Sequence, residues 1–368
     1  MKFRSVCFHL SLFLIVFISC SDKKAKLEET DLANIAPVTP KVIISFDNID
    51  NVYFKYIGDK SIATKNGDIL ISDRRLPTIL LLSPDLKVKK SLLEGRGPGE
   101  ILDAYEFNSD KDGNFYIYDQ GNKKMLVYDD ELNLIREMIP KPFEGSAITK
   151  VYPMGASNVL LELTSFEFLE NKEESTKKIF IQYNLDTEFY GEKLVLDDRP
   201  FARSFMGDKI VGAVEVPFSF AQLTAHNPNN ESIFMFDTRT SVIAEVDFNY
   251  DTLRVIPVSL PAELLNDAEI DSIRKDASKV KNIDSWKSMK PMLSEYKSVA
   301  ENILFYNENI WLQSNLRGDY QKWFVLNMDG KIIKAVHLPK DGMVTHISEH
   351  HLGVRLDDAT FGLFEAVE

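Results

Sequence analysis

Residues 103–139 of the chain read DAYEFNSDKDGNFYIYDQGNKKMLVYDDELNLIREMI. Short apolar runs alternate here with polar turns, of which the clearest are Lys111–Asn114 and Asp129–Glu131. Gly, Asn and Asp tolerate positive φ, so turns of this composition between apolar runs indicate β-hairpins. The stretch therefore predicts four antiparallel strands in one meander.

The same pattern of runs and turns recurs along the chain. Its second turn carries an aspartate in each of five copies, and these are Asp85, Asp130, Asp186, Asp251 and Asp329. The spacings between them are 45, 56, 65 and 78 residues. A minimal four-stranded blade of a β-propeller takes about 40–45 residues, so we expect the later copies to carry insertions.

The two ends of the repeat complement each other. A sixth copy runs from Val344 to Phe364 and stops one strand short, whereas residues 41–46 form a strand with no hairpin partner. An N-terminal strand that completes the last sheet closes a ring, and a ring leaves only short, protected sheet edges. We therefore expect an all-β six-bladed propeller of four-stranded antiparallel blades. A sandwich or a pair of β domains would need neither the fourfold rhythm nor the spare first strand.

One stretch, residues 261–297, departs from this rhythm. It places Ala, Glu, Leu and Lys at roughly helical spacing from Pro261 until Pro291 ends the pattern. Apolar and charged residues are mixed, so we expect a short surface helix in an insertion between blades four and five. The insertion is either a cap over one face of the ring or plain surface decoration.

The N-terminus has the form of an export signal. Lys2 and Arg4 precede an apolar run over residues 10–18, which is too short to span a bilayer. The run ends at Ser19 and Cys20 in a pattern that resembles a bacterial lipobox, in which the cysteine begins the mature chain and carries the lipid. An ordinary signal peptide with an incidental cysteine is the alternative.

Accordingly, the chain divides into three predicted parts. These are a signal peptide at 1–19, a lipidated tether at 20–40 and the propeller at 41–368. The sequence holds 43 basic and 56 acidic residues, a formal charge of −13, so it lacks the basic footprint that nucleic acid selects. Cys20 is the last cysteine, so with that residue acylated no thiol is left for a disulfide, a nucleophile or a metal.

A glycine-rich motif, residues 94–100, reads EGRGPGE. It lacks the Gly-Lys-Ser/Thr of a phosphate-binding loop and the spacing and helix of a dinucleotide fingerprint. Glycines around a proline favour a tight crossing, here from the outer strand of blade one to the inner strand of blade two. Arg96 and Glu100 either face the central funnel and bind a ligand, or pair locally to fix the crossing.

With this motif the chain resembles a known group. The run Gly95–Glu100, the turn Asp112–Asn114 and the strand Tyr116–Asp119 are similar to those of TolB-like or NHL-like six-bladed propeller lipoproteins of Bacteroidota. The resemblance covers essentially all of 41–368 and implies a fold, an envelope compartment and a binding scaffold. The insertions in blades three to five depart from it, so no function carried by loops transfers.

The residues that follow Cys20 bear on localisation. Surface-export signals in Bacteroidota favour several acidic residues after the cysteine, but this chain has Ser21, a single Asp22 and two lysines. We therefore expect an outer-membrane lipoprotein of the cell envelope that faces the periplasm, with surface display as the alternative.

Catalytic patterns are sparse. There is no Gly-x-Ser-x-Gly elbow. His346 and His350 have a metal-ligand spacing only on a helix, and this stretch reads as strand and turn, so we expect turn and surface histidines and no metal. Trp311 and Trp323 fall in predicted strands and should pack within a blade. Trp286 lies in the insertion, where we expect it to be exposed and able to stack on a sugar or a protein partner.

Two functions follow from these observations. The first is a lipid-anchored, non-enzymatic scaffold without a cofactor that binds a peptide, glycan or envelope protein, with Arg96, Glu100 and Trp286 as candidate ligand-binding residues. The second is a divalent-metal-dependent hydrolase or lactonase, in which scattered acidic residues would hold Ca²⁺ in the central channel.

The lipidation site gives a direct test. Cys20→Ala removes the acyl attachment point, so we expect the protein to leave the membrane fraction of the cell, as followed by immunoblot. A variant that still sediments with membranes at high salt would refute the lipobox. Protease treatment of intact cells, with lysed cells as control, then distinguishes a periplasmic from a surface location.

Overall fold

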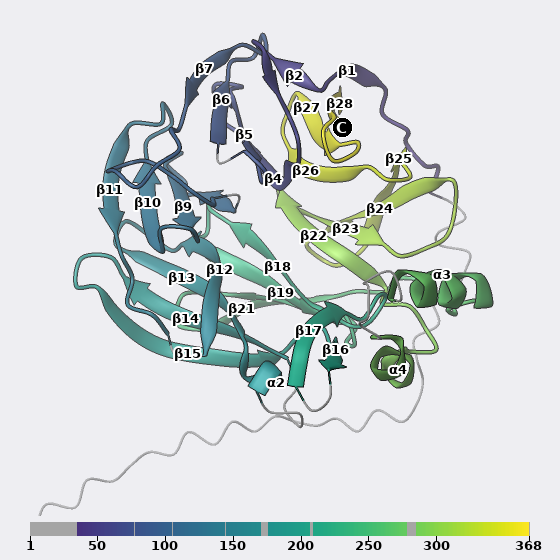
Figure 1. Cartoon of the computed structure of the whole chain (residues 1–368). Helices are drawn as coiled ribbons and strands as arrows, with labels where there is room; N and C mark the ends of the chain where they lie inside the picture. The colour runs from purple at the N-terminus through teal and green to yellow at the C-terminus, as the bar shows by residue number, and fades with distance from the viewer. Residues whose placement is uncertain are drawn as a thin grey trace, which may run out of the picture.

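The computed structural model describes residues 35–76, 78–104, 106–143, 145–170, 176–206, 209–277 and 285–367. Within these residues, six four-stranded antiparallel sheets stand around a common axis (Figure 1). Each sheet is a blade, and the first strand of each lies nearest the axis. The predicted six-bladed propeller is confirmed.

The first three blades follow one another in chain order. Blade 1 consists of β4 (Ile57–Ala63), β5 (Ile69–Asp73), β6 (Thr78–Leu82) and β7 (Val88–Ser91). Blade 2 consists of β8 (Phe107–Ser109), β9 (Phe115–Asp119), β10 (Lys124–Tyr128) and β11 (Leu134–Met138). Blade 3 consists of β12 (Ser146–Pro153), β13 (Asn158–Ser165), β14 (Lys177–Asn184) and β15 (Phe189–Asp197).

The remaining blades carry the insertions and the ring closure. Blade 4 consists of β18 (Gln222–Asn227), β19 (Ser232–Asp237), β20 (Val242–Val246) and β21 (Thr252–Pro257). Blade 5 consists of β22 (Ala300–Tyr306), β23 (Asn309–Ser314), β24 (Tyr320–Asn327) and β25 (Ile332–Pro339). Blade 6 consists of β26 (Met343–Ile347), β27 (His351–Arg355), β28 (Phe361–Glu365) and the N-terminal β1 (Val42–Phe46).

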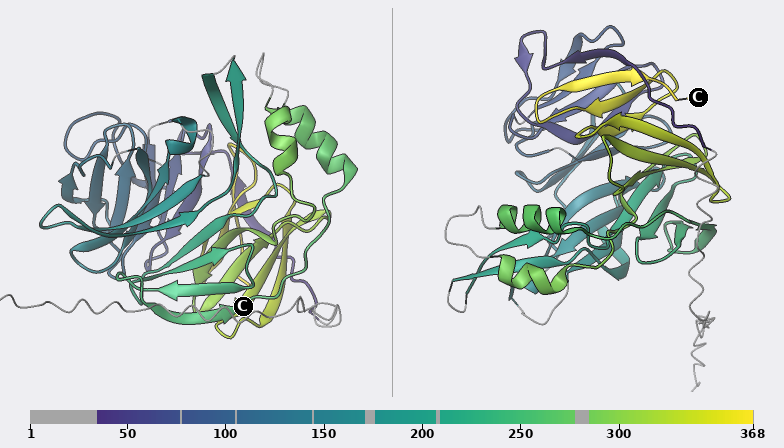
Figure 2. Two further views of the ribbon diagram at one scale, coloured as in Figure 1. Left: turned by 90° about the horizontal axis from the view of Figure 1, so that it is seen from below. Right: turned by 90° about the vertical axis from the view of Figure 1, so that its right-hand side faces the viewer.

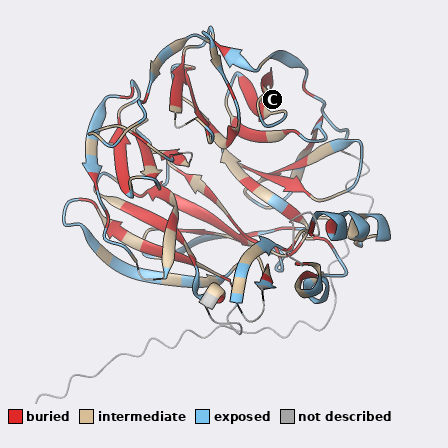
Figure 3. Ribbon diagram, in the orientation of Figure 1, coloured by how far each residue is buried: buried red, intermediate tan, exposed pale blue. Residues whose placement is uncertain are grey.

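Burial follows the order of the strands within a blade. The middle strands are buried on both faces, as in β5 and β6, because each blade packs between two neighbours. Leu81 of blade 1, for example, shares one apolar cluster with Ile117 and Leu126 of blade 2. The outer strands are largely exposed and form the rim (Figure 3). The hydrophobic core is thus divided into layers between blades.

A buried aspartate at the end of the second strand fixes the chain where it enters a blade. Asp119 accepts backbone N–H bonds from Leu102 at 3.0 Å and from Asp103 at 2.8 Å, and it also accepts one from Gly121 at 3.1 Å. Asp73 holds the corresponding position in blade 1. A carboxylate that collects several backbone donors leaves few buried polar groups unsatisfied. This clamp explains the aspartate that ends the Tyr116–Asp119 motif.

Ring closure uses the N-terminal strand. β1 pairs with β28 in antiparallel register, from Val42 opposite Phe364 to Phe46 opposite Phe361. The ring of Phe46 also packs against Phe361, with centroids 5.5 Å apart, and against Phe54. The predicted completion of the last blade by residues 41–46 is therefore confirmed.

Side chains join the first and last blades nearer the axis. Arg355 of β27 donates to the Asp59 carboxylate of β4 at 2.6 Å. The Ser61 hydroxyl lies 2.6 Å from that of Thr345 and 2.5 Å from Nδ1 of His346. These contacts join residues nearly 300 positions apart in the sequence.

Two additions stand on one face of the ring (Figure 2). The predicted insertion is partly helical and contains α3 (Asp267–Ala277), α4 (Trp286–Met289) and the 3₁₀ turn η1 (Lys290–Met292). A hairpin that the sequence analysis did not anticipate, β16 (Phe201–Met206) and β17 (Lys209–Glu215), packs against it. Ala202 and Val216 share an apolar cluster with Ile273 and Met289. We call the hairpin and helices together the wall. The predicted insertion thus forms one part of the wall, and the wall rises beside the axis of the ring.

Smaller elements complete the fold. The pair β2 (Asn48–Ile49) and β3 (Val52–Tyr53) follows β1, and α2 (Glu167–Glu170) lies between two strands of blade 3. Residues 1–34, with the predicted signal peptide and Cys20, lie outside the described residues. Near the end of the predicted tether, the Val38 N–H donates to the Ala335 carbonyl at 2.8 Å and its carbonyl accepts from His337 at 2.9 Å. No helix in the described part of the chain is long and apolar enough to cross a membrane.

Deletion of residues 41–47 tests ring closure. The truncated chain loses the β1–β28 ladder and exposes the edge of β28, including buried Phe361 and Phe364, so we expect it to lose about 3–5 kcal/mol or more of unfolding free energy. Thermal unfolding should become broad and shift to lower temperature, relative to a control chain that begins at Ile35. An unchanged single transition would contradict closure by this strand.

Candidate functional site

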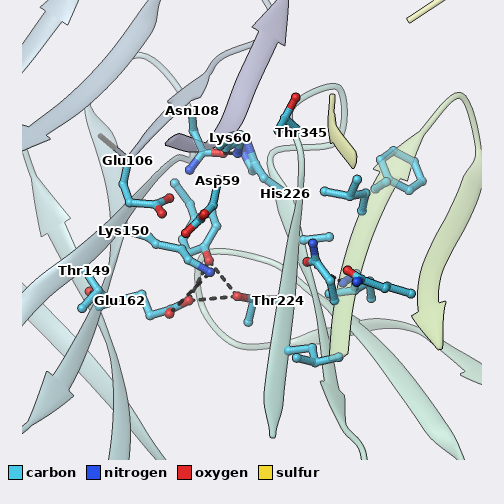
Figure 4. A pocket seen from close by; sticks show the side chains of 18 of the residues that line it. Asp59, Lys60, Glu106, Asn108, Thr149, Lys150, Glu162, Thr224, His226 and Thr345 are labelled. Atoms are coloured by element: carbon cyan, nitrogen blue, oxygen red, sulfur yellow. Dashed lines mark hydrogen bonds and ion pairs between the residues drawn. The ribbon is translucent and has the colours of Figure 1, made fainter. Parts of the chain in front are cut away.

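A cavity of ≈ 800 Å³ occupies the axis of the ring. The first strand of every blade contributes to its lining, which includes Lys60 of β4, Asn108 of β8, Lys150 of β12, Thr224 of β18, Leu304 of β22 and Thr345 of β26. The first strand of each blade is the edge of its sheet next to the axis, so runs of consecutive residues, such as 59–63 and 301–306, contribute to the lining. Several of these side chains converge in Figure 4. We call this cavity the central pocket.

The most densely bonded group in the central pocket is the Glu162 carboxylate. It accepts hydrogen bonds from Tyr152 at 2.6 Å and Thr224 at 2.9 Å. The ammonium groups of Lys178 and Lys150 lie 3.4 and 3.8 Å from its other oxygen. Burial alone would raise the pKa of Glu162, but the two lysines and the two hydrogen bonds lower it to about 2. Glu162 is therefore a fully partnered anion.

The groups around Glu162 are held in defined protonation states. Burial and the Glu162 charge raise the pKa of Tyr152 well above its usual value, so the phenol keeps its proton and donates it. Lys178 also donates to the Gln222 carbonyl at 2.7 Å and lies 3.6 Å from Asp198. Burial lowers the pKa of His226 to about 3, so its ring is neutral, and Nε2 lies 2.9 Å from the Pro153 carbonyl.

Two charged groups in the same pocket lack such partners. Lys60 bonds to the neutral amide of Asn108, and burial is the main cause that lowers its pKa to about 8. Burial raises the pKa of Glu106. Among the described residues, Glu106 forms neither a hydrogen bond nor an ion pair, although Lys150 and Lys60 are close enough to act on its charge. These groups keep hydrogen-bonding capacity that the protein does not use.

The opposite side of the pocket, from blades 5 and 6, is mostly uncharged. Leu304, Tyr306 and Ile347 line it, with Glu301 exposed beside them. Gln313 is only 8% exposed, yet its carbonyl oxygen Oε1 has no hydrogen-bond partner in the described part of the chain. A buried amide oxygen without a donor costs free energy unless water or a ligand supplies one. The pocket thus pairs a charged half with a mostly uncharged half.

His346 corrects an expectation from the sequence. The sequence analysis assigned it to a turn or the surface, but the structure buries it between blades 1 and 6, with Nδ1 bonded to Ser61. Burial lowers the pKa of His346 to about 3. The sequence pattern of an apolar strand does not reveal that His346 is buried, because its hydrogen-bond partner, Ser61, lies near the other end of the chain.

Acidic residues do not assemble into a metal site in the described part of the chain, where no three His, Cys, Asp or Glu side chains come together to hold an ion. In the pocket, Glu162 and Asp198 are paired with lysine, and Asp59 with Arg74 and Arg355. A Ca²⁺ ion takes 6–8 oxygen ligands, typically including several carboxylates. The residues of the central pocket do not match that donor set.

Comparisons with known proteins agree with the fold. No protein-family model and no curated protein matches the chain. A solved structure described as a member of the DUF4221 family, from Bacteroides vulgatus, is 12% identical, covers 90% of this chain and 98% of its own, and has a TM-score of 0.52. A candidate exported protein from Bacteroides fragilis is 12% identical over 90% of this chain and 99% of its own, with a TM-score of 0.48.

A gluconolactonase from Xanthomonas campestris is 9% identical over 85% of this chain and 86% of its own, with a TM-score of 0.45. At such low identity, likeness between structures shows a shared fold alone. The likeness to the Bacteroides vulgatus structure, whose TM-score is above 0.5, therefore supports the propeller fold, and the function has to come from the site.

The candidate residues from the sequence lie outside the central pocket. Arg96 is exposed, and the Glu100 carboxylate accepts a hydrogen bond from the Gly97 N–H at 2.6 Å within the crossing between β7 and β8. Trp286 is half-buried in α4, where it packs against the apolar cluster of the wall. Ligand binding by Arg96, Glu100 or Trp286 stays a prediction. Trp311 and Trp323 are buried within blade 5, as expected.

Sequence reasoning missed the residues that do line the pocket. Lys60, Glu106, Lys150 and Thr224 all stand in or beside the first apolar run of a copy. Polar residues that interrupt the innermost strand of successive copies are the signal that could have found them, because the innermost strands converge at the axis.

The Glu162 network predicts a pH-dependent stability. In Glu162→Gln the anion is lost, so at pH 7 we expect the variant to unfold with about 2–3 kcal/mol less free energy than wild type. Folding depresses the pKa from 4.5 to about 2, so this advantage is present above pH 4.5 and disappears as the pH falls to 2. Urea unfolding at several pH values measures the difference.

The exposed Glu131→Gln serves as the matched control and should change little. A wild-type advantage over Glu162→Gln that is constant from pH 7 to pH 2 would contradict the ionised state assigned to Glu162.

Proposed function

We propose that the protein is a lipid-anchored envelope propeller that binds a small polar ligand, or the end of a peptide or glycan chain, in the central pocket. The observation that carries the proposal is the set of unpartnered groups there. Among the described residues, the Glu106 carboxylate accepts no hydrogen bond and forms no ion pair, and Lys60 uses one of its three donors. Buried polar groups are normally hydrogen-bonded, so a site that leaves several open is prepared for an external partner.

The arrangement also limits the ligand's chemistry. Glu106 accepts, and Lys60 and Lys150 donate. A molecule with hydroxyl or amino groups meets both kinds of site, whereas an apolar ligand would leave the polar groups desolvated. Leu304 and Ile347 provide apolar surface for the carbon skeleton.

The wall supports binding of a chain end. Arg199, Phe201 and Glu215, at the base of the β16–β17 hairpin, contribute to the pocket lining. The hairpin and helices therefore extend one side of the pocket beyond the face of the ring (Figure 2). A longer ligand would place one end in the pocket and lie against this side.

Envelope location rests on the N-terminal sequence. The apolar run at 10–18 and Cys20 are typical of a lipoprotein signal, and the lysines after Asp22 favour the periplasmic orientation over surface display. A lipid on Cys20 would hold the propeller at the outer membrane while the pocket stays accessible to periplasmic ligands.

Ligand binding is tested in two stages. Thermal unfolding is measured with separate panels of monosaccharides, amino acids and dipeptides, and a compound that raises the melting temperature is titrated by calorimetry. Because Glu106 offers the free carboxylate, we expect Glu106→Gln to bind at least 10-fold more weakly, about 1.4 kcal/mol.

The matched control for this test is Glu131→Gln in the exposed β10–β11 turn, which should bind like wild type. Stabilisation by none of the three panels, or equal affinity of Glu106→Gln and wild type, would refute binding at these groups.

A further inference from the structure

Lys60 differs from the other lysines of the central pocket in what its amino group contacts. Lys150 and Lys178 form ion pairs with Glu162. Lys60 instead donates to Oδ1 of Asn108, and among the residues that the structure describes no carboxylate pairs with it (Figure 4). The ammonium form of Lys60 therefore lacks the partner that stabilises its two neighbours.

Asn108 is held in place to serve as that neutral partner. Its side chain is only 3% exposed, and its Nδ2 donates to the Val151 carbonyl at 2.7 Å. This bond fixes the amide so that its oxygen points to Lys60. An amide oxygen accepts a hydrogen bond from an uncharged amine as well as from an ammonium group. The contact thus permits a neutral Lys60.

The charges around Lys60 act in both directions. Burial lowers the pKa of Lys60 to about 8, and the positive charge of Lys150 lowers it as well, whereas the negative charges of Glu106 and Glu162 raise it. A desolvated lysine of this kind is how proteins obtain an amine nucleophile near neutral pH.

We propose that Lys60 reversibly captures the carbonyl group of a hydroxylated aldehyde or ketone, such as an open-chain sugar, as an imine. The proposal rests on the binding function proposed for the central pocket and names the chemistry of one part of it. The pocket has the necessary room, at ≈ 800 Å³. Its free hydrogen-bonding groups suit the hydroxyl groups of such a ligand.

The step balances without an oxidant or a reductant. The Lys60 nitrogen lone pair forms the C–N bond, and the electrons of the C=O π bond move to oxygen, which takes up a proton. The resulting carbinolamine loses this oxygen as water after a second proton transfer, while nitrogen gives up its protons. The products are one imine and one water. Glu106 lines the same pocket, and burial raises its pKa, so it can deliver and recover these protons.

Reductive trapping tests the proposal. The purified full chain is treated with glycolaldehyde and sodium cyanoborohydride at pH 7, and the modified lysines are quantified by peptide mass spectrometry. A lysine with a pKa of about 8 has a roughly 300-fold larger fraction of free amine at pH 7 than one at 10.5. We therefore expect Lys60 to react at least 10-fold faster than exposed Lys87 and than paired Lys150.

The matched variant is Asn108→Asp, which gives Lys60 a carboxylate partner of the same size. We expect it to slow trapping at Lys60 at least 10-fold, with its melting temperature recorded as a check on folding. If this variant does not fold, the pH dependence of trapping in the wild type decides. A rate at Lys60 that levels off above about pH 8 supports the proposal, and a rate that still rises through pH 10 overturns it.

Trapping spread evenly over the surface lysines, with Lys60 no faster, also overturns the imine. That failure is distinct from failure of the proposed function, because non-covalent binding is measured separately through Glu106→Gln. Selective loss of the Lys60 adduct in Lys60→Met, with the surface adducts unchanged, completes the positive result.

Discussion

The pairing of β1 with β28 is the contact on which the rest of the molecule depends. Without it, β28 would be an open sheet edge, and the first and last blades would be joined only by contacts such as the Ile57 N–H bond to the Asp358 carbonyl and the pair of Asp59 with Arg355. The central pocket exists because six first strands converge on one axis, and they do so only in a closed ring. The geometry of every pocket residue therefore rests on a strand from the opposite end of the chain.

The charged groups of the central pocket differ in how far neighbouring groups compensate their charge. Glu162 recovers its desolvation cost through two lysines, a phenol and a hydroxyl, so it is a structural anion. Lys60 and Glu106 are only half-buried, yet burial shifts the pKa of each and neither has a comparable set of partners among the described residues. Groups whose pKa is perturbed by burial and that remain open to a cavity are the ones that functional sites use.

Local sequence signals were sufficient for the fold and insufficient for the site. Turn residues such as Asp130 and Asp329 mark hairpins wherever they occur, because their backbone preferences act within a few residues. Residues 41–46 could be placed in the last blade because a ring leaves no other partner for them. By contrast, the Lys60–Asn108 contact and the burial of His346 depend on neighbours from other blades, which no local pattern encodes. The β16–β17 hairpin was missed because it lies outside the fourfold repeat.

The attachment of Val38 to β25 has a mechanical consequence. Val38 exchanges two backbone hydrogen bonds with blade 5 a few residues before β1 joins blade 6. A pull on the chain from its N-terminal side would meet blade 5 first, and only after those bonds yield would tension reach the ladder that closes the ring. The chain is attached to two adjacent blades in succession. Force applied at the N-terminus therefore breaks hydrogen bonds at the rim before it can distort the central pocket.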